Sequence, residues 1–179
     1  RIDKEMLREN SEGLFALSAC LGGETAQRFM NEGTDAARNA AREYKQIFAP
    51  DHFFLELQDN KYPEQNKVNG FYKQLARDED IPLIATNDAH YLNRSDAKAH
   101  EVLMCIQTGN TLNDADRMRH ATDELFLKNP KEMWAADSFS DVPEALANTQ
   151  LIADQCSLDL DLGKVYLPNF KVPEGYTRV

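Results

Sequence analysis

Two side chains that commonly bind metals, Asp88 and His90, lie three and five residues after the apolar run IPLIA at residues 81–85. Such a run is typical of a strand buried on both faces. Residues two apart in an extended chain point to the same side, so both side chains can reach one ion or one proton-transfer site. Carboxylate and imidazole together suit Zn²⁺, Mn²⁺ or Fe²⁺. The alternative, that Asp88 caps the next turn and His90 is a partly exposed loop residue, stays open on these residues alone.

Cys20 occupies the equivalent place at the end of the first predicted strand, residues 13–20. A thiolate is a good soft ligand and a thiol is a small core hydrophobe, and for a single cysteine the core interpretation is favoured. Two strand ends that both present ligand-type residues strengthen the metal interpretation. On the second predicted strand, residues 52–58, Glu56 alternates with apolar residues and could point inward, but a solvated or helix-facing position is favoured.

Other candidate residues carry weaker signals. Arg117, Arg119 and His120 could contact a phosphate backbone, although a charged loop is usually only solvated. His100 lies within a predicted helix, and we interpret it as structural. No Ser/His/Asp arrangement, P-loop or dinucleotide-binding glycine pattern is present. A catalytic ion usually needs three protein ligands, so the remaining ligands must lie outside this chain or the site does not function in it.

The elements that must position these residues alternate between strand and helix. Three such units are predicted at about residues 13–48, 52–79 and 81–109, followed by a helical segment at 129–156. Within them, Thr34 is expected to cap a helix, residues 124–128 could form a short strand, and Asn129 and Asp141 each begin a helix-start signature. The helix at 94–108 should end at Gly109 and turn four apolar residues inward: Ala99, Val102, Leu103 and Ile106. Alternating strands and helices predict an α/β fold with a parallel sheet or part of a (β/α) barrel.

Composition limits the classes of function. The chain has 179 residues and a formal charge of −10, which disfavours nonspecific binding to nucleic acid unless a bound cation reverses the local sign. Its three cysteines show no CxxC spacing, and this favours a reducing cytosol. No apolar run is long enough to span a bilayer, and no membrane partner is expected. The start at Arg1 suggests a fragment of a longer protein.

Several longer segments resemble the second half of the PHP (polymerase and histidinol phosphatase) domain of bacterial DNA polymerase III alpha subunits. The resemblance spans nearly the whole chain and is carried by GLFALSACLGGE at 13–24, FFLELQ at 53–58, IPLIATNDAHY at 81–91, AHEVLMCIQTG at 99–109, PEALANT at 143–149 and LPNF at 167–170. The TNDAHY and PEALANT segments are the most specific.

The resemblance implies part of a distorted (β/α)₇ barrel with a metal site of two or three ions at its carboxyl rim. By motif, Cys20, Asp88 and His90 match the family's late metal ligands, while its early ligands precede Arg1. Because all three positions are ligand-competent, the chain is similar to the metal-retaining members, which resemble a 3′→5′ exonuclease using a metal-bound water. The implied ions are Zn²⁺ or Mn²⁺ here and Mg²⁺ for the polymerase activity of the parent protein.

The same resemblance implies a place in a replicative polymerase. Residues 1–165 would form the later part of the PHP domain, and 166–179 an extended linker toward the polymerase core. The implied partners are DNA, through the parent polymerase, and other subunits of the holoenzyme in the bacterial cytoplasm. This segment alone is expected to be inactive. Two alternatives are a stand-alone PHP phosphoesterase and a metal-free scaffold that docks the proofreading subunit.

Overall fold

A three-stranded parallel sheet organises the chain. The computed structural model describes residues 2–165, 167 and 172–175. The strands β1 (Ala16–Leu17), β2 (Phe53–Gln58) and β3 (Leu83–Thr86) lie in the order β1-β2-β3. Ala16 pairs with Phe53, and Leu55 pairs with Leu83. The predicted α/β class and the parallel strands are confirmed, and within the described residues the sheet is open.

The central strand β2 is buried along its whole length. Successive side chains of a strand point to opposite faces, so Phe53, Leu55 and Leu57 share one face with Leu83 and Ala85 of β3. Helices cover that face and complete the main core. Their buried contributions come from Ala26, Ala41, Ile47, Val68, Tyr72, Leu75, Ala76, Ala145 and Leu146. The opposite face carries Phe54, Glu56 and Gln58.

Four helices supply this cover. They are α2 (Glu24–Glu32), α3 (Thr34–Ile47), α4 (Pro63–Glu79) and α7 (Glu144–Gln155), and they fall within the predicted units at 13–48 and 52–79 and the helical segment at 129–156. Thr34 is not the cap of α3 as expected. It is the first helical residue, and Gly33 takes the cap position with φ of 95°. Asp141 does not cap α7 either: Pro143 takes the cap position, and the Asp141 carboxylate pairs with Lys73.

The strand predicted at residues 13–20 is much shorter, at Ala16–Leu17. It has a strand neighbour on one side only, and Ala19 adopts a left-handed conformation with φ of 64°, which ends the pairing. Gly23 then packs so closely that a Cβ atom there would lie 2.1 Å from the carbonyl oxygen of Ser18. Only glycine permits this turn into α2.

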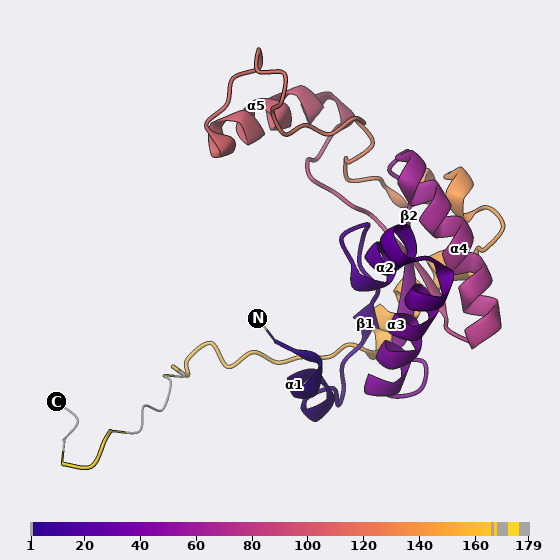
Figure 1. The fold of residues 1–179 in the computed structure, drawn as a ribbon, viewed down its shortest axis with the longest axis vertical. Helices are drawn as coiled ribbons and strands as arrows, with labels where there is room; N and C mark the ends of the chain where they lie inside the picture. Colours follow the sequence, from indigo (N-terminus) through magenta and orange to yellow (C-terminus); the bar gives the residue numbers. More distant parts are fainter. Residues whose placement is uncertain (1, 166, 168–171, 176–179) are drawn as a thin grey trace.

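Residues 93–124, called the α5 lobe below, stand apart from the sheet and its helices (Figure 1). The lobe contains a short 3₁₀ helix (Arg94–Asp96), then α5 (Ala97–Thr108), and a long return loop. Gly109 ends α5 with φ of 70°, as predicted. The predicted inward face is wrong: Ala99, Val102, Leu103 and Ile106 are all exposed. Met104 and Cys105 are the buried residues of α5.

Shorter elements complete the chain. They are α1 (Lys4–Glu9), α6 (Pro130–Trp134) and a 3₁₀ helix at Asp137–Phe139. Asn129 caps α6 with the predicted reciprocal box, in which its side chain accepts from Glu132 N and the Glu132 carboxylate accepts from Asn129 N. The strand expected at 124–128 is reduced to a single bridge between Phe126 and Tyr91.

The chain after α7 has no regular structure where it is described. Leu158, Leu160 and Leu162 are 70–90% exposed. Of the linker predicted at 166–179, the structure describes only Leu167 and residues 172–175. The last three residues of the LPNF motif, 168–170, lie outside the described residues. None of the described helices combines the length and apolar character needed to cross a membrane.

Candidate metal centre

Asp88 and His90 meet just beyond the end of β3. His90 Nε2 lies 3.1 Å from Asp88 Oδ1, and both side chains are about one-third exposed. The backbone N–H of His90 donates to the carbonyl of Leu125 at 2.8 Å, which fixes the chain that carries the imidazole. The predicted convergence of the two side chains is therefore present. A carboxylate oxygen and an imidazole nitrogen at this separation fit two positions in the coordination shell of a zinc-type ion.

Cys20 lies at the same end of the sheet, because the strands are parallel, and its side chain is exposed. This exposure argues against the interpretation of Cys20 as a core thiol. Across residues 2–165, 167 and 172–175, however, no group of three or more His, Cys, Asp or Glu side chains is close enough to hold one ion. The described chain thus presents a pair of donors at one strand end and a separate thiol at another.

Two further histidines surround His90. The ring centroids of His90 and His120 are 4.8 Å apart, and His100 lies 5.5 Å from His90 and 5.6 Å from His120. The sequence favours a structural role for His100 and a solvated loop position for His120, with a phosphate contact as the alternative, and it does not reveal this cluster. The three residues come from different parts of the chain, and no spacing pattern connects them.

The environment of His120 favours its neutral form. Burial lowers the pKa of His120, the neighbouring imidazoles of His90 and His100 lower it further, and Asp88 opposes them. Its Nδ1 atom lies 2.9 Å from the hydroxyl of Tyr62. Burial also raises the pKa of Tyr62, so that hydroxyl keeps its proton at neutral pH and can donate to the imidazole.

A cavity of about 330 Å³ opens beside this histidine cluster. It is lined by Tyr91, Ala97, Lys98, His100, Glu101, Met104, His120 and Thr122.

The two arginines that could contact phosphate, Arg117 and Arg119, differ in their surroundings. The Arg117 guanidinium donates to Glu101 Oε1 at 2.6 Å and to the carbonyl of Asp114 at 3.0 Å. Arg119 is exposed.

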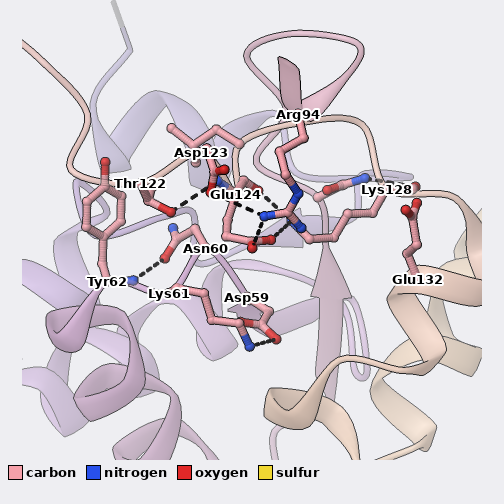
Figure 2. A network of polar contacts seen from close by, with 12 residues as sticks. Asp59, Asn60, Lys61, Tyr62, Arg94, Thr122, Asp123, Glu124, Lys128 and Glu132 are labelled. Carbon is pink, nitrogen blue, oxygen red and sulfur yellow. Dashed lines mark hydrogen bonds and ion pairs between the residues drawn. The ribbon is translucent and has the colours of Figure 1, made fainter. Parts of the chain in front are cut away.

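A polar network joins the two ends of the α5 lobe (Figure 2). Arg94, at the start of the lobe, contacts Asp123 at 3.2 Å and also pairs with Glu124 at its end. At the nearby carboxyl end of β2, Asp59 pairs with Lys61 at 3.1 Å. The Arg94 contacts join the two ends of the lobe to each other, and the Asp59–Lys61 pair lies in the loop that follows β2.

The chain is similar in sequence to known proteins. The profile of the PHP domain family matches residues 1–60. Over 99% of its length, the chain is 42% identical to the DNA polymerase III subunit alpha of Campylobacter jejuni and 44% identical to that of Thermus aquaticus. The subunit from Helicobacter pylori strain J99 is 39% identical. The chain spans about 15% of the length of the first two relatives.

Proposed function

Because the chain belongs to the PHP domain family, in the form found in alpha subunits of DNA polymerase III, we propose that it is the later part of such a domain in a bacterial replicative polymerase. Within that protein it supplies ligands to a divalent-metal site that cleaves phosphodiester bonds from a 3′ end. The observation that carries this proposal is the 3.1 Å approach of His90 Nε2 to Asp88 Oδ1 at the end of β3.

The donor set supports a zinc- or manganese-type ion. Asp88 and His90 would take two coordination positions, Cys20 is the third candidate from this chain, and the rest come from other parts of the polymerase. Such an ion supplies positive charge that stabilises a phosphodiester during cleavage and makes water more acidic. The chain itself holds His90 through the backbone bond to Leu125 and places a neutral His120 beside it. Mg²⁺ would serve the polymerase reaction elsewhere in the protein.

The remaining assignments follow from membership of a polymerase. Its partners are DNA and the other holoenzyme subunits, and its place is the bacterial cytoplasm. The matched relatives are several times longer than this chain, which favours a part of a polymerase over a stand-alone phosphoesterase. This segment by itself is expected to lack both polymerase and nuclease activity.

One observation favours a second candidate function, a metal-free scaffold that docks the proofreading subunit. Within the described residues no third ligand joins Asp88 and His90. A scaffold needs no complete ligand set. The two candidates differ in whether the intact polymerase binds metal at these residues.

The test is the metal content of the intact polymerase, measured by elemental analysis after dialysis against Zn²⁺ or Mn²⁺. The double variant Asp88→Asn plus His90→Gln should lose at least one equivalent of metal per polypeptide. The matched control is Asp51→Asn plus His52→Gln, an adjacent Asp-His pair at the opposite end of the sheet. An equal metal content per polypeptide in the unmodified protein and both variants would contradict the proposed site and favour the scaffold.

A further inference from the structure

The face of the sheet opposite the helices contains a buried carboxylate, that of Glu56, which has no role in the proposed metal site. Glu56 is 9% exposed, so the solvated position expected from the sequence is wrong. It lies on the face opposite the helices, because its neighbours Leu55 and Leu57 point into the main core. Burying a charge without a compensating charge is costly, and such groups are normally paired or bind a cation.

The hydrogen bonds of Glu56 are few and all neutral. The Thr86 hydroxyl and the Gln58 amide, at 3.2 Å, both donate to Glu56 Oε1. Glu56 forms no ion pair within the described part of the chain. Gln58 Oε1, in the same layer, is buried and accepts no hydrogen bond there. The partners that Glu56 has within the described residues therefore carry no positive charge, and a cation nearby would balance the buried carboxylate.

This layer lies directly before the candidate ligands along β3. Gln58 pairs with Thr86 in the sheet register, and Thr86 is the last residue of β3, two before Asp88. Ser18, at the end of β1, accepts a hydrogen bond from the backbone N–H of Glu56 at 2.9 Å. Glu56 thus connects the ends of all three strands at the point where the chain leaves the sheet toward Asp88 and His90.

We propose that Glu56 is a positioning residue of the Asp88–His90 metal site: it anchors Thr86 at the end of β3 and places negative charge in the layer behind the ion. The inference rests on the proposed function. Residues that orient metal ligands in this indirect way typically change metal affinity 10–100-fold when they are replaced. A residue important only for folding would change the melting temperature instead.

The experiment measures Mn²⁺ affinity by electron paramagnetic resonance titration, together with the melting temperature, in the intact polymerase. The affinity that is compared is that of the Mn²⁺-binding sites that disappear in the double variant Asp88→Asn plus His90→Gln. Glu56→Gln keeps the size and one acceptor but removes the charge, and about tenfold weaker binding is expected. Thr86→Val should weaken binding in the same way, and Thr86→Ser, which keeps the hydroxyl, should restore it. Glu64→Gln, at an exposed position of α4, is the control.

The outcomes separate the two proposals. If the Asp88 and His90 double variant loses Mn²⁺ but Glu56→Gln and Thr86→Val bind it like the unmodified protein, the role of Glu56 is refuted and the metal site stands. That role is also refuted if Glu56→Gln lowers only the melting temperature. If the double variant binds normally, the proposed function fails and the Glu56 role fails with it. Should Glu56→Gln not fold, the comparison of Thr86→Val with Thr86→Ser decides.

Discussion

The backbone of Tyr91 pairs in parallel with that of Phe126, so the chain enters and leaves the α5 lobe through adjacent positions. The N–H of Leu127 donates to the carbonyl of Tyr91 at 3.0 Å, and the carbonyl of Leu125 accepts a hydrogen bond from the N–H of His90. His90 is therefore held by the same junction that attaches the lobe. Disturbing this junction should affect both the lobe and the candidate ligand.

Replacing Phe126 with alanine should loosen the lobe. Its ring is buried, and its centroid lies 4.7 Å from the guanidinium of Arg94 and 4.5 Å from the ammonium of Lys128. Loss of a buried phenyl group costs about 3 kcal/mol, and we expect faster amide hydrogen exchange throughout α5. Leu127→Ala is the control, because Leu127 is 55% exposed. Equal exchange rates in the two variants would contradict the role of the junction.

The exposed face of α5 predicts a contrast between two neighbouring positions. Ile106 is 72% exposed and Met104 is 7% exposed. In this chain Ile106→Ala should change the free energy of unfolding by less than about 0.5 kcal/mol, whereas Met104→Ala should cost about 2 kcal/mol. Urea denaturation measures both. A larger loss of unfolding free energy for Ile106→Ala than for Met104→Ala would favour the inward orientation of Ile106 that the sequence predicted.

Asn148 protects the outer edge of β3. Its Nδ2 atom donates to the carbonyl oxygen of Leu83 at 2.7 Å, from helix α7. Asn148→Ala would leave that carbonyl without this donor and should cost about 1–2 kcal/mol in thermal unfolding. Gln150→Ala removes an exposed contact within α7 and should have little effect. If both variants melt alike, the edge contact contributes nothing measurable.

The ion pairs of Glu79 predict a dependence of stability on acid pH. Hydrogen bonds from Arg42 and Arg38 of α3 hold the pKa of Glu79 below its usual value. A lowered folded-state pKa stabilises the fold above the ordinary glutamate pKa, and this stabilisation is lost as the pH falls through the lowered value. Between about pH 5 and pH 3 the unmodified chain should therefore lose more stability than Glu79→Gln, by about 1 kcal/mol or less. High salt should reduce the difference, and parallel pH profiles at low salt would contradict the prediction.

Local patterns predicted most of the elements. The predicted strand–helix unit at 52–79 and the helix-start signature at Asn129 depend on neighbours within a few positions, and the structure has the helices α4 and α6 at these places. Pairing across the sheet is not local. The strand expected at 13–20 shrinks to Ala16–Leu17 because it has only β2 beside it in the described structure.

In the candidate site, too, local spacing predicts some features and contacts between distant residues determine others. Spacing alone brings Asp88 and His90 together, because they are two residues apart in extended chain, and the segments around them were enough to identify the family. Only tertiary structure determines what surrounds that pair. It gathers His100 and His120 from distant segments, buries Glu56 next to Thr86, and turns the apolar residues of α5 to the outside. Contacts between residues far apart in the chain decide these features, and no short-range pattern encodes such contacts.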